Sequence, residues 1–512
     1  MDWTEGYASD VQYTAGFYRE QAPAYLNFAC VLNGVEPVDL SQPFTYCELG
    51  FGRGITANVL AAANPLGRFY AADFNPAHVA GARQLAGQAG LENLVLLESS
   101  FEELASGQVA GLPQFDFITL HGIYTWITAE NRAHVVAFLA RYLKPGGIVY
   151  LSYNAMPGWA VSMPLQRFII EHAALQPGRS DVQIKAAREF IGKMRAQNVG
   201  YLSSAALEKR LRLLDTQDPH YLVHEYMHKH WQPMYFADVA AELGGAKLEF
   251  VGSAELSGAY PGLFLSPEQL TLMQQSDDPV FTQTVRDYLM NTSFRKDVFV
   301  RGARRMPALR QAEALGQAGV ALIVEPELAS NLMTVQSAEL TGNAELYLPF
   351  IEALRSGPKS LAELHRLPAL AFTGIADLAQ VAALLTASGQ AAVYFPTAVQ
   401  PDSSAAARMN AALSAHTRFA DEYQVLASHL LGSGVETNFL ERMVFHALAS
   451  GIAAQDRPAL IQTVCTILAA QGQTILQAGK AVTEAHAIEQ EVGIKVDAVL
   501  AQRLPLWRAL QI

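Results

Sequence analysis

The stretch that decides the fold is Cys47-Glu48-Leu49-Gly50-Phe51-Gly52-Arg53-Gly54. An apolar run ends at Leu49 and a helical pattern begins near Thr56, so we expect a strand, a turn of glycines and a helix. Glycine has no Cβ, which lets such a turn bend tightly and lets a ligand approach its backbone. A second apolar run ends at Asp73, whose carboxylate can accept both hydrogens of a ribose diol. The pattern therefore predicts a βαβ unit that binds a nucleoside.

The glycine spacing argues against a dinucleotide. A dinucleotide site prefers G-x-G-x-x-G, whereas here the third glycine comes one residue early and Ile55 follows it. Glu48 precedes the first glycine, and an acid there suits an amine-bearing ligand better than a pyrophosphate. The acid-led turn with its distant aspartate resembles class I methyltransferases, which use S-adenosylmethionine (SAM). The resemblance implies these cofactor-binding residues: Glu48, Gly50, Gly52, Gly54, Asp73, Phe74, Ser100, Phe101, His121 and Gly122.

Composition narrows the class of protein. The chain has 512 residues, of which 51% are hydrophobic and 16% charged, so we expect a folded protein of several domains. It lacks an apolar run that could span a bilayer, its first residues lack the layout of a secretion signal, and its three cysteines have no paired spacing. A net charge of −12 argues against nucleic acid as a partner. We therefore expect a soluble cytoplasmic protein without membrane insertion.

The alternation of strand and helix between residues 43 and 153 predicts a doubly wound α/β sheet. Expected strands are 45–49, 68–72, 94–98, 115–120, 147–153, 247–252 and 297–300, and expected helices in the first half are 55–63, 76–88 and 130–142. We predict a Rossmann-like methyltransferase domain over 30–305, with helical insertions at 157–230 and 256–292. A separate middle domain is the rival interpretation of those insertions. A winged-helix-like domain over 306–400 and a helical domain over 401–512 would follow.

An aromatic arm precedes the first strand. Residues 1–29 contain Trp3, Tyr7, Tyr13, Phe17, Tyr18, Tyr25 and Phe28. Such a segment could cover the cofactor, or it could be ordinary packing on the core. The sequence leaves both open.

The chemistry is expected where the fourth and fifth strands end, because ligands of such sheets bind at the carboxyl ends of the strands. His121 could offer its backbone carbonyl, act as a base with a pKa near neutrality, or simply cap the strand. Tyr124, Tyr153 and Asn154 are the residues we expect to orient an acceptor amine. Trp126 and Trp159 could wall the substrate channel.

Adenine recognition departs from the usual pattern. Methyltransferases often place an acid after the third strand to accept from the adenine amino group, and here Ser100 takes that position. Phe101 is a candidate stacking face.

The run His224-Glu225-Tyr226-Met227-His228 matches the H-E-x-x-H pattern of zinc proteases. Its flanks do not have the periodicity of a long amphipathic helix, so we expect no metal there. His224, Glu225 and Tyr226 are expected to line a substrate channel or to fix the inserted segment.

Several motifs recur in this order in one bacterial family. They are Tyr18 with 23–26, the glycine turn, 121–126, 153–159, 224–226 and 294–302. The chain thereby resembles class I methyltransferases that carry a methyltransferase regulatory domain, whose relatives include bacterial lysine methyltransferases acting on outer-membrane proteins. The resemblance implies SAM as cofactor and the lysine of a protein as methyl acceptor, with a homodimer as a possible assembly. Two alternatives stay open: a small-molecule methyltransferase, and a SAM-binding regulatory protein without activity.

Overall fold

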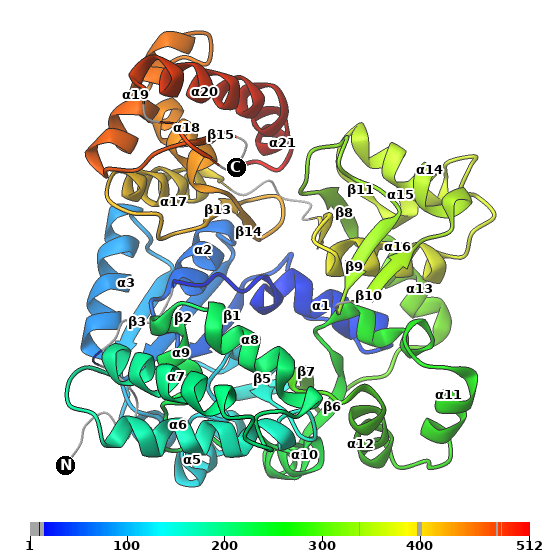
Figure 1. Cartoon of the computed structure of the whole chain (residues 1–512). Helices are drawn as coiled ribbons and strands as arrows, with labels where there is room; N and C mark the ends of the chain where they lie inside the picture. The colour runs from blue at the N-terminus through cyan, green and yellow to red at the C-terminus, as the bar shows by residue number, and fades with distance from the viewer. Residues whose placement is uncertain (1–9, 11–14, 337, 397–401, 478–479, 483) are drawn as a thin grey trace.

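The computed structural model describes residue 10 and residues 15–336, 338–396, 402–477, 480–482 and 484–512. Its centre is a seven-stranded sheet with the order β3-β2-β1-β4-β5-β7-β6 (Figure 1). The strands are β1 (Phe44–Leu49), β2 (Gly67–Asp73), β3 (Leu94–Glu98), β4 (Phe115–Leu120), β5 (Leu143–Asn154), β6 (Leu248–Ser253) and β7 (Phe294–Arg301). The order reverses between β1 and β4, which is where such sheets bind ligands.

The first five strands are parallel, and β7 runs antiparallel to both β5 and β6. Parallel strands need crossover helices, here α2 (Ile55–Ala63), α3 (Pro76–Gln88), α4 (Phe101–Ser106) and α5 (Ala129–Tyr142). The predicted methyltransferase sheet with helical insertions is confirmed. β5 begins earlier than expected, since Leu143 already pairs with Phe115 before the Lys-Pro-Gly-Gly run.

The α-helices between β5 and β6 fall into two groups: the first four share a core of their own, and the last packs against β6. They are α6 (Met163–Ala174), α7 (Ser180–Ala196), α8 (Glu208–Thr216), α9 (Pro219–Tyr226) and α10 (Phe236–Gly244). α6 to α9 enclose a small hydrophobic core around Trp159, Ile184 and Leu211. α11 (Pro267–Met273) and α12 (Pro279–Met290) separate β6 from β7. The sheet closes with β7, near residue 302 as predicted.

Two cations of β7 pair with acids inside the fold. Arg295 is buried and pairs with Asp287 at 2.7 Å and Asp297 at 2.8 Å. Lys296 pairs with Glu20 beside α1 (Pro23–Leu32). These cations hold the end of the sheet together instead of facing water.

Residues 306–396 contain α13 (Ala308–Gln317), β8 (Gly319–Leu322), β9 (Leu332–Val335), β10 (Ala338–Thr341), α14 (Ala344–Arg355), β11 (Lys359–Ser360), α15 (Leu361–His365), α16 (Ile375–Ala387) and β12 (Ala391–Tyr394). The strands β11, β8 and β12 form one small sheet. Its core is continuous with that of the seven-stranded sheet through Phe28 and Val31 of α1. The winged-helix comparison stays a prediction.

The C-terminal region was expected to be helical, and it also contains two short hairpins. Its elements are α17 (Ser404–Ala415), β13 (Val425–Ser428), β14 (Ser433–Glu436), α18 (Phe439–Ala449), α19 (Arg457–Ala470), β15 (Leu476–Gln477), β16 (Lys480–Ala481), α20 (Ala485–Ala498), η7 (Val499–Arg503) and α21 (Leu504–Ala509). Met409 and Leu413 of α17 pack with Ile55 and Leu85 of α2 and α3. The region therefore shares a core with the glycine turn's own helix.

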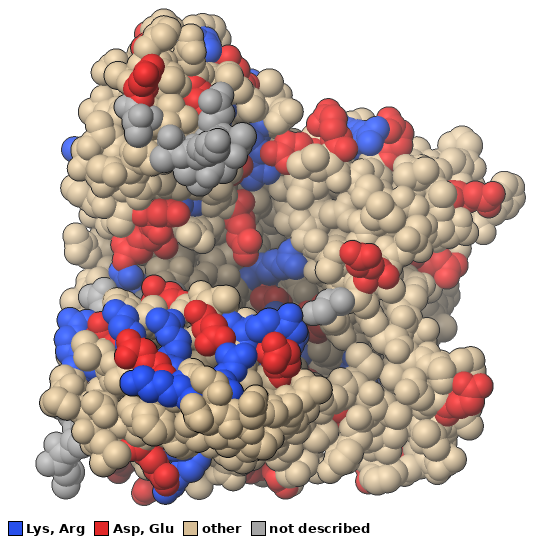
Figure 2. All heavy atoms as spheres, viewed as in Figure 1, with Lys and Arg blue, Asp and Glu red and all other residues tan. Residues whose placement is uncertain are grey.

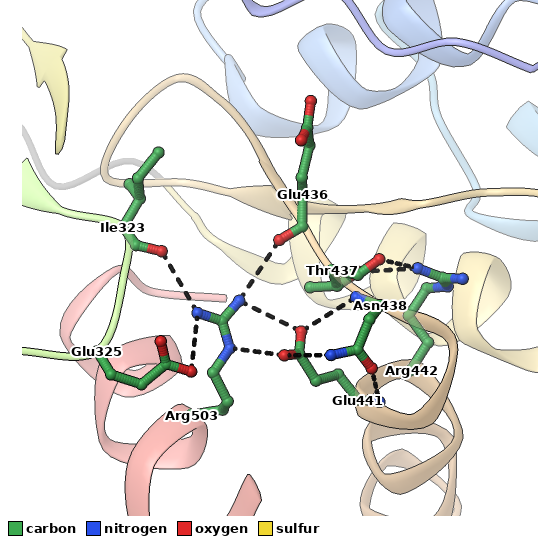
Figure 3. Close-up of polar contacts among 8 residues, drawn as sticks. All are labelled: Ile323, Glu325, Glu436, Thr437, Asn438, Glu441, Arg442 and Arg503. Atoms are coloured by element: carbon green, nitrogen blue, oxygen red, sulfur yellow. Dashed lines mark hydrogen bonds and ion pairs between the residues drawn. The ribbon is translucent and has the colours of Figure 1, made fainter. Parts of the chain in front are cut away.

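Arg503 joins the C-terminal region to residues 306–396. Its guanidinium donates to the carbonyl oxygens of Ile323 and Glu436 and pairs with Glu441 and Glu325 (Figure 3). A buried arginine that lost these acceptors would be left as an uncompensated charge, so this contact fixes the two regions relative to each other.

Candidate active site

A cavity of about 540 Å³ opens at the carboxyl ends of the parallel strands. It is lined by the glycine turn, by the residues that follow β2, β3 and β4, and by α9. From the predicted set it contains Glu48, Gly50, Gly52, Asp73, Phe74, Ser100, Phe101, His121, Gly122, Trp126, His224 and Glu225. Most of the cofactor residues and part of the substrate channel thus meet in one place.

The three glycines of the turn serve different purposes, although all have positive φ. A Cβ at Gly50 would lie 2.5 Å from Ile123 Cδ1, and one at Gly54 would lie 2.6 Å from Ala82 Cβ. A Cβ at Gly52 would meet nothing within 4 Å, because it would enter the cavity. Gly52 therefore keeps space for a ligand, whereas Gly50 and Gly54 keep the turn close to its neighbours. Gly54 does not line the cavity itself.

Asp73 holds the turn as well as facing the cavity. Its Oδ2 accepts from the N–H of Gly52 at 2.8 Å, and its Oδ1 accepts from the N–H of Asn75 at 2.9 Å. His78 Nδ1 lies 3.2 Å from the same Oδ1. A carboxylate can accept about four hydrogen bonds, so capacity remains for a ribose hydroxyl.

Glu48 is a buried acid at the bottom of the cavity. Gln21 Nε2 donates to its Oε1 at 3.3 Å, while its Oε2 has no hydrogen-bond partner among the described residues. Burial raises the pKa of Glu48 to about 8, and the nearby Asp73 adds to that rise. A cationic group would compensate the charge of this buried carboxylate. The ammonium group of SAM is such a cation, and it can also donate hydrogen bonds.

The adenine end of the cavity differs from the expectation in one detail. Ser100 is the N-cap of α4: it accepts from the N–H of Glu103 at 3.2 Å, and its own N–H donates to Glu103 Oε2 at 2.8 Å. Glu98 and Glu103 both line the cavity. Position 100 therefore offers no acid, and Glu98 and Glu103 are the two acids that the cavity presents beside it.

His121 is not placed as a base. Its ring stacks on Tyr18 with centroids 3.6 Å apart, and its Nδ1 lies 2.8 Å from the Tyr150 hydroxyl. Enclosure between these rings lowers the pKa of His121 to about 3, so the imidazole is neutral and weakly basic at physiological pH. The suggestion of a near-neutral pKa is corrected, and the backbone carbonyl remains as its candidate contribution.

The aromatic arm was expected either to cover the cofactor or to pack on the core, and its described residues divide between the cavity and the core. Tyr18 lines the cavity, whereas Tyr25 and Phe28 belong to the hydrophobic core. Trp3, Tyr7 and Tyr13 lie outside the described residues.

A second wall of the cavity comes from α9 and the segment after β4. Trp126, His224, Glu225 and His228 line it, and the Trp126 and His228 rings are 5.0 Å apart. Burial raises the pKa of Glu225 to about 7, although the charge of Arg210 works against that rise. An aromatic ring beside an acid and two imidazoles suits an amine that must enter as a cation and lose a proton.

Three of the predicted acceptor-orienting residues lie elsewhere. Tyr124 is buried and donates to Glu242 Oε2 at 2.5 Å, and Tyr153 is buried and donates to Asp297 Oδ2 at 2.7 Å. Asn154 is buried too, with its backbone N–H bonded to Thr125. None of the three lines the cavity. Tyr124 and Tyr153 belong to the hydrophobic core of the sheet instead. The placement does not support their predicted role.

Trp159 and Tyr226 are likewise core residues of the inserted helices. The Trp159 ring packs under the guanidinium of Arg210 at 3.7 Å. Of the proposed channel residues, the structure brings Trp126, His224 and Glu225 to the cavity.

The H-E-x-x-H run does not continue as one helix, since α9 ends at Tyr226 and His228 follows it. The His224 and His228 ring centroids are 5.8 Å apart. Within the described ranges, no group of three His, Cys, Asp or Glu side chains is arranged to hold a metal ion. In the same ranges, no helix is long and apolar enough to cross a membrane.

Two parts of the chain match known protein families. The family described as "Methyltransferase domain" matches residues 47–147, and "Predicted methyltransferase regulatory domain" matches residues 218–301. An uncharacterized protein of Synechocystis sp. is 37% identical over the full length of both chains. The chain belongs to this methyltransferase family. SAM is accordingly its cofactor, as predicted.

Two structures of PKMT2 from Rickettsia typhi share the fold of this methyltransferase over nearly its whole length. The one in complex with AdoHcy has a TM-score of 0.73 at 17% identity and covers 97% of this chain and 99% of that chain. The other has a TM-score of 0.71 at 17% identity and covers 96% and 99%. The likeness extends beyond the sheet, so the C-terminal half of this methyltransferase is part of a shared architecture.

The sequence missed several residues of the cavity. Arg53, His78, Glu98, Glu103, Ile123, Asn131 and His228 line it as well. Arg53 lies inside the quoted turn and His78 five residues after Asp73, in the first turn of α3, so their positions next to the motif were the available signal. Asn131 offered none, because its place depends on how α5 packs.

Proposed function

We propose that this methyltransferase transfers methyl groups from SAM to the side-chain amine of lysine in a protein substrate. The observation that carries the proposal is the division of one cavity into two walls. The glycine turn, Glu48 and Asp73 form a wall suited to the cofactor, and Trp126 with Glu225 forms a wall suited to a cation.

The first wall would hold SAM. Asp73 and the space at Gly52 fit a ribose, the acids at 98 and 103 fit an adenine amine, and Glu48 fits an ammonium. When bound, SAM supplies an electrophilic methyl group on a sulfonium. The chain has to hold the acceptor in line with that group and keep water out.

The second wall would prepare the acceptor. A lysine amine has a reference pKa of about 10.4 and must lose a proton before it attacks. Glu225 is the acid best matched to receiving that proton, because burial raises its pKa to about 7. With SAM bound, the neutral amine would be held for in-line attack on the methyl group, and Glu225 would pass the proton it has taken to solvent. Trp126 would restrain the aliphatic stem of the lysine.

Transfer from radiolabelled SAM to a denatured bacterial proteome, followed by mass spectrometry of the labelled residues, tests the proposal. Label on lysine is the expected result. Label confined to small molecules would support the small-molecule alternative, and label confined to carboxylates or cysteines would exclude lysine. Calorimetric SAM binding without any labelled acceptor would favour the regulatory alternative.

A further inference from the structure

The outer face of the inserted helices differs in charge from the rest of the molecule. Between residues 179 and 212 the chain has eight Lys and Arg but only three Asp and Glu, whereas its net charge is −12. Figure 2 shows these cations gathered over α7 and α8, where Figure 1 places the front of the insertion. We call this surface the basic face. Its cations are Arg179, Lys185, Arg188, Lys193, Arg195, Lys209, Arg210 and Arg212.

Among the described residues, three of these eight cations form ion pairs: Arg179, Arg195 and Arg212. Lys185, Lys193 and Lys209 are exposed and, like Arg188 and Arg210, form no ion pair with any described residue. The pairs that do form are at the surface, such as Arg195 with Asp215 at 2.7 Å, and pairs of this kind stabilise a fold very little. Stability of the insertion comes from its apolar core, so the unpaired lysines are available for a ligand.

The basic face is continuous with the acceptor wall of the cavity. Arg210 of α8 lies on the Trp159 ring and acts electrostatically on Glu225 and Tyr226 of α9. α7 also packs directly against α9, which carries His224 and Glu225 into the cavity. A chain that crosses the basic face can therefore reach the cavity over one helix.

The ligand that fits is an acidic stretch of polypeptide. Two acids, Glu189 and Glu208, lie among the cations of this face. A uniform polyanion such as nucleic acid would be repelled by both of these carboxylates. A polypeptide can place its carboxylates opposite the lysines and avoid those two positions. It can also present one lysine side chain to the cavity.

We propose that the basic face formed by α7 and α8 docks an acidic segment of the substrate protein that flanks the methylated lysine. This inference rests on the proposed function for the identity of the acceptor, but docking itself is independent of catalysis. It assigns the insertion a role in choosing which lysines are methylated.

The test compares two charge-reversal variants of the full chain. The first carries Lys185→Glu, Lys193→Glu and Lys209→Glu on the basic face. The control carries Lys247→Glu, Arg366→Glu and Arg508→Glu at exposed positions elsewhere, with the same change in net charge. Calorimetry with SAM and a melting curve should show both variants folded and equal to the wild type in cofactor binding.

Two fluorescein-labelled peptides serve as probes: a central lysine flanked by Asp and Glu, and the same peptide with Asn and Gln. By fluorescence anisotropy, the acidic peptide should bind the wild type and the control at least tenfold more tightly than the neutral peptide, and this advantage should disappear in the basic-face variant and at high salt. Equal binding by the wild type and the basic-face variant would overturn the inference, as would tighter binding of DNA or anionic vesicles.

Methyl transfer to the acidic peptide separates this inference from the proposed function. Docking predicts that KM rises about tenfold in the basic-face variant while kcat changes little. Tight binding of the acidic peptide without any methylated lysine in the wild type would contradict the proposed function and leave docking supported. Methylated lysine with the same KM in the wild type and the basic-face variant would support the proposed function and contradict docking.

Discussion

The two walls of the cavity are built in different ways. The cofactor wall comes from the ends of consecutive strands, between Glu48 and Glu103, and repeated hydrogen bonds such as Gly52 to Asp73 fix it. The acceptor wall combines a segment after β4 with α9, about a hundred residues later in the chain. A local motif can therefore specify how the methyl donor binds, whereas the proposed function makes the choice of acceptor depend on an insertion that packs over the sheet. The variants below either break this division or sharpen it.

Glu225→Gln should have the largest effect, and only on the acceptor side. Losing a proton acceptor whose pKa is raised to about 7 should lower kcat roughly a hundredfold. SAM affinity, measured by calorimetry, should stay as in the wild type. The wild-type rate should rise through about pH 7 as Glu225 ionises, and this step should be absent in the variant and restored by Glu225→Asp. Glu171→Gln on α6, an exposed acid of the same insertion that lies outside the basic face, is the control. An unchanged pH profile in Glu225→Gln would exclude it as the base.

Asp73→Ala should act only on the cofactor side. It removes a carboxylate that accepts from Gly52 and faces the ribose site, so SAM should bind more weakly by about 1–3 kcal/mol. Asp116→Ala, at the opposite end of the sheet where Asp116 pairs with Lys144, changes stability but should leave SAM affinity intact. Equal losses of affinity in both variants would mean that the effect of Asp73 is global.

Glu48→Gln should change the pH dependence of stability. The pKa of Glu48 is raised to about 8 by burial, from an ordinary value near 4.5. As pH rises from about 5 to 8, the unfolded chain ionises this group while the folded protein keeps the proton, so the free energy of unfolding falls. Chemical denaturation across this range should show a shallower fall in the variant. Binding of SAM near pH 7 should release a proton from the wild type, measured by calorimetry in buffers of different ionisation enthalpy, and release none from Glu48→Gln.

Glu422→Gln should have the smallest effect. Glu422 of the C-terminal region pairs with Arg53 of the glycine turn, and Tyr423 lies beneath the same guanidinium at 5.9 Å. Loss of the pair should weaken SAM binding about threefold, the scale of a partly exposed ion pair. Glu313→Gln, at the exposed partner of Arg310, is the matched control. A tenfold or larger loss would show that the C-terminal region controls the cofactor wall directly.

The sequence by itself determined the sheet and the cofactor wall. Apolar runs of strand length, glycines at 50, 52 and 54, and an acid at 73 are local features, and local features largely determine a βαβ unit. The bounds of the strand Phe115–Leu120 were predicted to the residue, and the insertion was predicted to be helical.

Only the tertiary structure decided the acceptor wall. The sequence placed Tyr124 and Tyr153 beside the cavity because they follow strand ends, but their hydroxyls turn inward to the acids Glu242 and Asp297. Those partners lie more than a hundred residues away, and no periodicity records which buried hydroxyl will meet which acid. The same holds for Glu225, whose raised pKa exists only because the inserted helices exclude water from it. Burial and long-range pairing are properties of the packed chain, and they select the groups that line the cavity.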